Sequence, residues 1–358
     1  MADPPAPPGI DPESLAAEFT RQAARGVPLP AGRPLQVTLI PGGLSNLTYL
    51  VTGPGEVDGV IVRRGPLGHV LPTAHDMSRE FRVLTALSGT PVPAPRPLYQ
   101  WPHPEPMGAP YYVMERLPGV VLRRPEDLAA LPPAIAEAIA DRLVDALVSL
   151  HAVDPTAVGL SGADRGSDYL PRQLARWARQ AEGNRTRDLP DLAELADLLA
   201  ASTPATREVG IVHGDYRLDN VLVTLPGVTD AAGADAAEAG VAVSGILDWE
   251  MSTVGDVLTD VGMLWLYWQG VAGIGITPAP GAMPGFPDIA HLCRRYATRT
   301  GRDVTDLGWY VAFSFYKLAV IAEGIHARYQ RGATVGAGFE RVGQVVPVLL
   351  TRGLAHLP

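Results

Sequence analysis

The fold of this 358-residue chain is decided by His213-Gly214-Asp215-Tyr216-Arg217-Leu218-Asp219-Asn220. This stretch lies between two short apolar runs of β type, Ile211-Val212 before it and Val221-Leu222-Val223 after it. A second polar residue at the end of an apolar run is Asp248, which directly follows Ile246-Leu247. Strands that deliver carboxylates to loops hold reactive groups at the edge of a core. The pattern predicts two such strand ends, and the plain alternative is a pair of hairpin ends with solvated aspartates.

The spacing within the stretch is typical of a phosphoryl-transfer loop. Asp215 and Asn220 are five residues apart, as in the D-x-x-x-x-N run where the Asp accepts the proton of a substrate hydroxyl and the Asn holds Mg²⁺. Mg²⁺ prefers a few protein oxygens together with phosphate oxygens. We therefore predict Asp215 as the catalytic residue and Asn220 and Asp248 as metal ligands.

The runs H-G-D-Y-R-L-D-N-V-L (213–222) and I-L-D-W-E (246–250) together resemble the aminoglycoside phosphotransferase-like family, which includes choline kinases. They are most similar to its branch of kinase domains associated with acyl-CoA dehydrogenases. The resemblance implies an α+β, bilobal protein-kinase-like fold, with a small antiparallel-sheet N-lobe and a larger, mainly helical C-lobe. It also implies Mg²⁺ as cofactor and ATP or GTP as co-substrate. We expect a disordered tail at 1–12, a nucleotide-binding N-lobe at 13–117 and the C-lobe at 118–358, with the phosphotransferase domain covering about 35–300.

A glycine turn between the first two predicted strands is the candidate lid over the nucleotide phosphates. Gly42 and Gly43 would let backbone N–H groups approach phosphate oxygens without an intervening side chain. An ordinary β-hairpin could use the same turn. By resemblance, Ser45 and Asn46 line this loop as well.

The third predicted strand, Val60–Arg64, should carry a cation for the phosphates. Lysine cannot serve, because the only lysine of the chain is Lys317. Strand alternation puts Arg63 and Arg64 on opposite faces, and we favour Arg63 because the family places its cation there. By resemblance Glu80 is the acidic partner of this cation, on a helix expected over Pro72–Leu87 with Thr73 as N-cap. The alternative for Glu80 is a solvated helix carboxylate.

The resemblance also suggests roles for a base-binding strand end and for a supporting loop, whereas the role of one Gly/Pro-rich stretch stays open. Glu115 and Leu117, at the end of a predicted strand, would offer backbone groups to the nucleotide base. The Gly255–Asp260 run resembles a family segment in which Asp256 supports the loop, so we treat Asp256 and Asp260 as structural. The Gly/Pro-rich stretch 271–287 is either a flap over the acceptor or a linker.

Composition excludes several classes of partner. The net charge of -9 and the pI of about 5.4 argue against a nucleic-acid surface. No run of 18 apolar residues predicts a membrane span, and we find no signal peptide. The single cysteine, Cys293, excludes an intrachain disulfide and favours a reducing, cytoplasmic location. The sequence carries no signal for an oligomeric state.

The resulting hypothesis is an enzyme that phosphorylates an alcohol group of a small hydroxylated molecule. The resemblance suggests a hydroxyacyl derivative as acceptor, and Arg172, Arg176 and Arg179 could meet an anionic substrate or form a solvated helix face. One alternative is an antibiotic kinase of the aminoglycoside type, which needs a cluster of carboxylates for its polycationic substrate. The other is a nucleotide-binding pseudokinase, which the missing strand lysine would favour.

Overall fold

The computed structural model describes residues 7–30, 34–41, 46–55, 58–67, 76–105, 107–160, 168–206, 208–227, 240–332 and 339–357. The chain forms two compact units. The first consists of Met1–Val120 and Leu222–Glu250, and the second of Val121–Val221 and Met251–Pro358. Each unit is considered by itself below.

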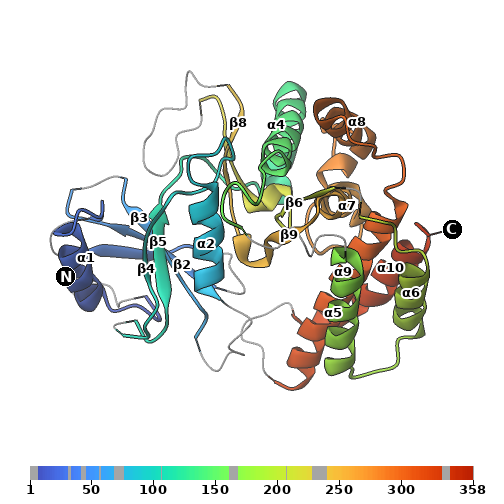
Figure 1. Cartoon of the computed structure of the whole chain (residues 1–358), viewed down its shortest axis with the longest axis horizontal. Helices are drawn as coiled ribbons and strands as arrows, with labels where there is room; N and C mark the ends of the chain where they lie inside the picture. Colours follow the sequence, from blue (N-terminus) through green and yellow to red (C-terminus); the bar gives the residue numbers. More distant parts are fainter. Residues whose placement is uncertain are drawn as a thin grey trace. The chain divides into compact units, whose positions relative to one another are not determined.

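The first unit is built on one antiparallel sheet, which lies beside α1 and α2 in Figure 1. Its strand order is β1-β2-β3-β5-β4. Its strands are β1 (Gln36–Leu39), β2 (Leu47–Thr52), β3 (Val60–Arg64), β4 (Pro97–Trp101) and β5 (Tyr111–Glu115). In β3 the residues alternate between buried and partly buried positions, as the period of two in a strand requires. Arg63 and Arg64 therefore project to opposite faces of the sheet, as the sequence indicated.

Each face of this sheet carries one helix. Helix α1 (Pro12–Ala23) places Leu15 and Phe19 in a core with Tyr49, Val62 and other strand residues. On the other face lies α2 (Met77–Leu87), where the ring of Phe81 meets that of Tyr112 edge-on. The side chain of Asp76 accepts hydrogen bonds from two N–H groups of the first turn and so begins α2. The helix thus starts later than the predicted Pro72, and the predicted cap Thr73 lies outside the described residues.

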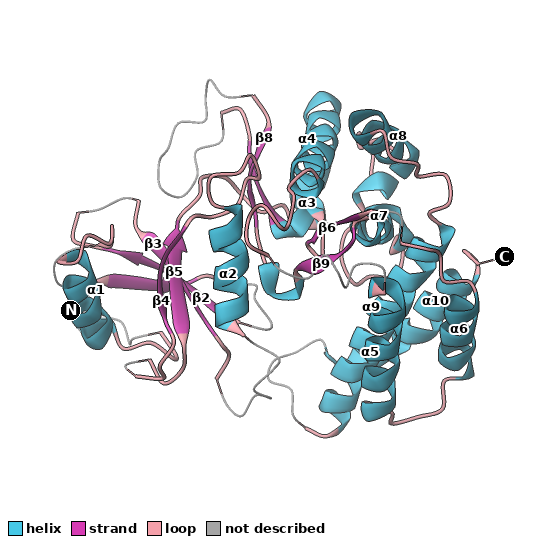
Figure 2. Ribbon diagram, viewed as in Figure 1, coloured by secondary structure: helices cyan, strands magenta, loops and turns pink. Residues whose placement is uncertain are grey.

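The second unit is mainly helical (Figure 2). Its helices are α3 (Pro125–Ala129), α4 (Pro133–His151), α5 (Tyr169–Gly183), α6 (Pro190–Ala201), α7 (Leu258–Trp265), α8 (Ile289–Thr300), α9 (Gly308–Gln330) and α10 (Val342–Leu354). Helix α9 is buried over most of its length and packs against α5, α6, α7 and α10. It forms the centre of this unit. No helix in the described part of the chain is long and apolar enough to cross a membrane.

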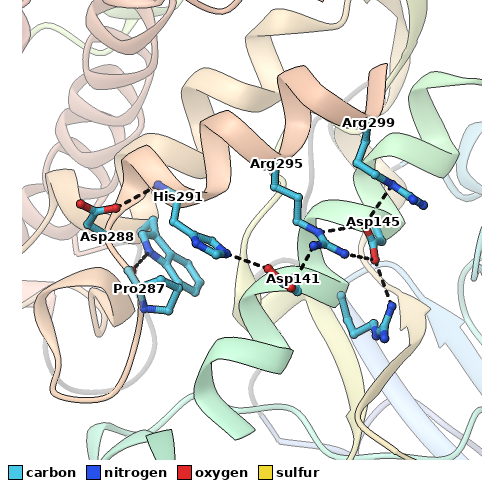
Figure 3. Close-up of polar contacts among 9 residues, drawn as sticks. Asp141, Asp145, Pro287, Asp288, His291, Arg295 and Arg299 are labelled. Carbon is cyan, nitrogen blue, oxygen red and sulfur yellow. Dashed lines mark hydrogen bonds and ion pairs between the residues drawn. The ribbon is translucent and has the colours of Figure 1, made fainter. Parts of the chain in front are cut away.

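Helices α4 and α8 are joined by a network of ion pairs (Figure 3). Asp141 accepts hydrogen bonds from His291 at 2.8 Å and from Arg295 at 2.9 Å. Asp145 accepts two more from Arg295, at 3.0 and 2.8 Å, and lies 3.5 Å from Arg299. These contacts give Asp141 and Asp145 a structural role.

Two short β-pairs present the polar stretches. Strand β6 (Val209–Val212) pairs antiparallel with β9 (Thr253–Asp256) in the second unit. Strands β7 (Val221–Thr224) and β8 (Ala242–Ile246) form the other pair. The loop of Asp215 leaves β6 and enters β7, and Asp248 follows β8, as predicted. The small antiparallel sheet and the helical unit confirm the predicted fold class, whereas the lobe boundary at residues 117 and 118 stays a prediction.

Candidate active site

The loop of Asp215 makes its turn at a glycine. Gly214 has a φ of 88°, and a Cβ atom built there would lie 2.7 Å from the carbonyl oxygen of Met251. Only glycine adopts this conformation without strain at so close an approach. The turn directs the chain from β6 into Asp215.

The amide of Asn220 fixes Asp215 from five residues away. Its Nδ2 donates to the backbone oxygen and to Oδ2 of Asp215, both at 2.9 Å. Because both of these hydrogen bonds use Nδ2, the amide oxygen Oδ1 is turned away from Asp215. The predicted spacing thus closes into a small ring with one carboxylate and one amide oxygen on the same loop.

A buried aspartate holds the backbone of the same loop. Asp260 accepts hydrogen bonds from the N–H groups of His213, at 2.6 Å, and Gly214, at 2.8 Å, and lies 3.3 Å from Nε2 of His151. Burial alone would raise the pKa of Asp260, but His151 and these donors bring it below its usual value. Asp260 therefore supports the loop, a role that the resemblance suggested for Asp256.

Arg217 and Tyr267 complete the surroundings of Asp215 and were not predicted. Nε of Arg217 lies 3.3 Å from Asp215 and 3.1 Å from Asp219. Its guanidinium carbon stands 4.7 Å from the ring centre of Tyr267. Tyr267 belongs to a π-helical turn, Leu266–Gly270, and such turns occur frequently at functional sites. A π-helical turn has no sequence pattern from which it could have been predicted.

In the first unit, Arg63 lies at the centre of a cluster of acids. Its Nε donates to Glu80 at 3.1 Å, its Nη2 donates to Asp248, and Glu250 lies 3.8 Å away. Burial alone would lower the pKa of Arg63, but Glu80 and the neighbouring acidic groups raise it above its usual value. Arg64 instead donates to the carbonyl oxygens of Gly9 and Met107 on the other face. The two predicted partners, Arg63 and Glu80, are thus brought together.

Asp248 stands in an unusual backbone conformation. Its φ of 65° makes it the one non-glycine residue with positive φ in the described part of the chain. Asp tolerates this region better than most residues, yet such outliers concentrate at functional sites. The next N–H group, of Trp249, donates to Glu80 at 3.3 Å. The turn after β8 is therefore tied to the partner of Arg63.

The cluster also includes Asn46 and Glu250. Nδ2 of Asn46 donates to Glu250 at 2.8 Å, and Asn46 is buried. Asn46 was predicted to line the phosphate loop, whereas Glu250 was overlooked although it lies two residues after Asp248. Gly42, Gly43 and Ser45, the other members of the predicted loop, lie outside the described residues.

The backbone N–H group of Glu115 already takes part in a hydrogen bond. It donates to the carbonyl oxygen of Arg96 at 3.0 Å, and the side chain of Glu115 accepts from the N–H group of Arg96 at 2.8 Å. Leu117 packs over Gly245, where an added Cβ would lie 2.6 Å from a Leu117 methyl carbon. Of the backbone groups predicted to read the base, the Glu115 N–H group is therefore already used.

Comparison with known proteins identifies the family. The model of the phosphotransferase enzyme family matches residues 36–283, which include both polar stretches. The chain belongs to the phosphotransferase enzyme family. This membership supports phosphoryl transfer to a small molecule.

Curated relatives of this phosphotransferase are larger proteins. It is 30% identical to acyl-CoA dehydrogenase family member 10 of Mus musculus over 90% of its own length and 29% of that protein. It is 31% identical to acyl-CoA dehydrogenase family member 11 of Gallus gallus over 91% of its length and 40% of that protein. The chain thus spans well under half of the curated relatives that it matches.

Solved structures agree with the family and the fold. A crystal structure of a protein from Ralstonia eutropha, provisionally named an aminoglycoside phosphotransferase, shares 31% identity with a TM-score of 0.76, covering 97% of this chain and 98% of that one. Choline kinase from Cryptosporidium parvum gives a TM-score of 0.62 at 14% identity, covering 95% of each chain. The second likeness shows the fold alone, which is the predicted protein-kinase-like fold.

Asn220 and Asp248 each offer an oxygen of the kind that Mg²⁺ binds. Within the described ranges, no group of three or more His, Cys, Asp or Glu side chains could hold a metal ion. Asn220 offers an amide oxygen, and the carboxylate of Asp248 is about one-third exposed. Mg²⁺ commonly takes one or two protein oxygens and completes its shell with phosphates and water. The predicted ligands Asn220 and Asp248 have this character.

Proposed function

We propose that this chain is a Mg²⁺-dependent phosphotransferase that moves the γ-phosphate of ATP or GTP to a hydroxyl of a small molecule. The observation that carries the proposal is the hydrogen bond of Asn220 to Asp215, which joins a carboxylate and an amide oxygen on one rigid loop. Family membership gives the proposal its reaction class.

In this proposal each side chain has one task. The acceptor hydroxyl gives its proton to Asp215, its oxygen bonds to the γ-phosphorus, and the bond from that phosphorus to the bridging oxygen of the leaving diphosphate breaks. Asn220 and Asp248 would hold Mg²⁺, which neutralises the charge of the phosphates. Arg63, which donates to Glu80, would neutralise part of the same charge. Most of the rate enhancement then comes from alignment and electrostatics.

We further propose a hydroxyacyl derivative as the acceptor, although other small hydroxylated molecules fit the same chemistry. The support is the similarity to proteins named acyl-CoA dehydrogenase family members, of which this chain matches less than half. The words acyl-CoA dehydrogenase in these names describe the whole proteins, not the part that this chain matches. The acceptor therefore needs a direct screen.

An aminoglycoside acceptor is the second candidate, and four carboxylates of the second unit are already engaged and so lend it no support. A polycation needs several available acids. Asp141 and Asp145 are paired with residues of α8, Asp288 caps that helix through His291, and Glu323 accepts a 2.6 Å hydrogen bond from Arg187. These groups already have structural partners.

The pseudokinase alternative loses its main support as well. It rested on the absence of a strand lysine. Arg63 makes the pair with Glu80 that this lysine would make, at 3.1 Å, and Asp215 and Asn220 remain in contact. We therefore favour an active phosphotransferase over a pseudokinase.

The test is a screen for phosphoryl transfer with Asp215→Asn as the matched inactive variant. Wild-type protein with Mg²⁺ and ATP or GTP is offered hydroxyacyl thioesters, free hydroxy acids, amino alcohols and aminoglycosides, and the phosphorylated product is detected by mass spectrometry. We expect transfer to drop by at least about 10³-fold in Asp215→Asn while nucleotide binding persists. Asp248→Asn should weaken Mg²⁺-dependent nucleotide binding itself. Full turnover by Asp215→Asn would refute the assignment of the base.

A further inference from the structure

The only lysine of the chain lies beneath the proposed catalytic loop. Lysine and arginine together number 29, and all but Lys317 are arginine. Lys317 belongs to α9 and is 6% exposed. A buried ammonium group is costly unless nearby groups compensate its charge. The partners of Lys317 therefore indicate what it does.

The contacts of Lys317 lead to Asp215. Its Nζ donates a hydrogen bond to the carbonyl oxygen of Gly214 and lies 5.5 Å from the ring centre of Trp177. Burial lowers the pKa of Lys317 to about 8, while the charges of Asp215 and Asp260 oppose this shift and Arg176 adds to it. The ammonium group thus lies near one carboxylate of the loop, Asp215, and one carboxylate that supports the loop from α7, Asp260.

The hydrogen bond of Lys317 fixes one particular peptide group. The Gly214 carbonyl belongs to the peptide bond that leads into Asp215, and the Gly214 N–H group is held at 2.8 Å by Asp260. Gly214 is therefore bound on both sides, from α7 and from α9. Because glycine has no side chain, its backbone has more conformational freedom than that of any other residue once these bonds are lost.

We propose that Lys317 is a positioning residue for phosphoryl transfer, which fixes the peptide bond preceding Asp215 and places a positive charge directly beneath the loop. This inference rests on the proposed function. It differs from a structural role in one respect: loss of the ammonium group should slow transfer even where the fold remains intact.

The variant Lys317→Met removes the positive charge but keeps most of the packing of the side chain, because methionine is uncharged and of similar length. Nucleotide turnover is measured with Mg²⁺ and ATP or GTP, with water as acceptor and with the best acceptor of the screen. We expect kcat to fall about 10- to 100-fold, as for loss of a hydrogen bond to a charged group, with the nucleotide KM within about twofold. Glu323→Gln, a buried polar change in the same helix, is the control and should leave kcat unchanged.

Rescue by small molecules tests the charge directly. In Lys317→Ala, n-propylammonium replaces the missing atoms, while 1-propanol fills the same space without charge. Restoration of kcat by the amine and not by the alcohol supports the proposal. Equal restoration by both, or a kcat in Lys317→Met equal to that of the wild type, overturns it. Should alanine prevent folding, as judged by circular dichroism, Lys317→Arg and Lys317→Met are compared, and equal rates in these two also overturn the proposal.

The proposed function fails in a different way. If the wild-type protein neither hydrolyses ATP or GTP nor phosphorylates any acceptor offered, the phosphotransferase assignment falls, and the role of Lys317 falls with it. If the wild type is active and Lys317→Met is equally active, only the role of Lys317 is refuted.

Discussion

Removal of the Arg63 charge should strongly destabilise the first unit. Arg63 is paired through Nε with Glu80, whose side chain is 2% exposed. Loss of one member of a buried pair leaves the other charge uncompensated, at a cost of about 3–5 kcal/mol. Asp248 and Glu250 are more exposed, at 32% and 24%, so each adds less than about 1 kcal/mol. Arg63→Met should therefore cost about 3–5 kcal/mol, a large share of typical stabilities of about 5–15 kcal/mol.

A second variant shows whether the cost comes from Glu80. In Arg63→Met/Glu80→Gln the carboxylate becomes a neutral amide, which can still accept the hydrogen bond from the N–H group of Trp249. The double variant should recover at least about 2 kcal/mol of the loss. Urea unfolding of the four proteins of this cycle gives the coupling free energy.

The pH dependence of the single variant follows from Glu80. Burial raises the pKa of Glu80 above its usual 4.5, and Arg63 opposes this shift. Without Arg63 the folded protein binds this proton even more readily than the unfolded chain. The penalty of Arg63→Met should therefore be smallest below about pH 4.5, where Glu80 is protonated in every state, and should grow as the pH rises through the raised pKa of Glu80 in the folded wild type.

Arg64→Met is the matched control on the same strand. It removes hydrogen bonds to Gly9 and Met107 on the opposite face, so it should lower stability by about 1–3 kcal/mol and leave nucleotide binding intact. Arg63→Met should lose nucleotide affinity. A penalty below about 1 kcal/mol for Arg63→Met, or a double variant no more stable than the single one, would refute this account of the cluster.

Three smaller changes test the loops. Gly214→Ala would bring a Cβ atom to 2.7 Å from Met251 at a φ of 88°, so its melting temperature should fall by several degrees, equivalent to about 2 kcal/mol or more. The free energy of unfolding measured in urea should be about 1 kcal/mol lower for Asp248→Ala than for Asp248→Gly. Both variants lack the carboxylate, but only alanine disfavours the positive φ of this position. Burial lowers the pKa of His151 below 6.5, so the unfolded chain binds the proton first and stability falls below about pH 6.5. His151→Asn should flatten this slope in melts between pH 5 and 7.

Features set by neighbouring residues could be predicted from the sequence. The opposite faces of Arg63 and Arg64 follow from strand alternation, and both contact sets agree with it. Asp215 and Asn220 were predicted to lie on one loop because they are five residues apart, and the hydrogen bond between them is consistent with that spacing. Both features depend only on residues that are close in the sequence.

Features set by distant segments could not be predicted with the same rules. Asn46 meets Glu250 across 204 residues, and Gly214 meets Lys317 across 103. Neither contact has a local pattern. The helix containing Glu80 begins at Met77 because Asp76 caps it, and proline and threonine upstream suggested an earlier start. The sequence shows a single lysine in an arginine-rich chain, but it does not show that Lys317 would lie against the loop of Asp215.

The replacement of lysine by Arg63 is explained by the geometry of its partners. A guanidinium group presents donors along two edges of one plane, whereas an ammonium group is a point charge. Arg63 uses Nε for Glu80 and Nη2 for Asp248, so one side chain orients both acids. Asp248, held at a φ of 65°, is thereby fixed in direction by a residue that cannot lose its proton. Mg²⁺ bound at Asp248 would share that carboxylate with Arg63, so Arg63→Lys should loosen the acid cluster even though it conserves the charge.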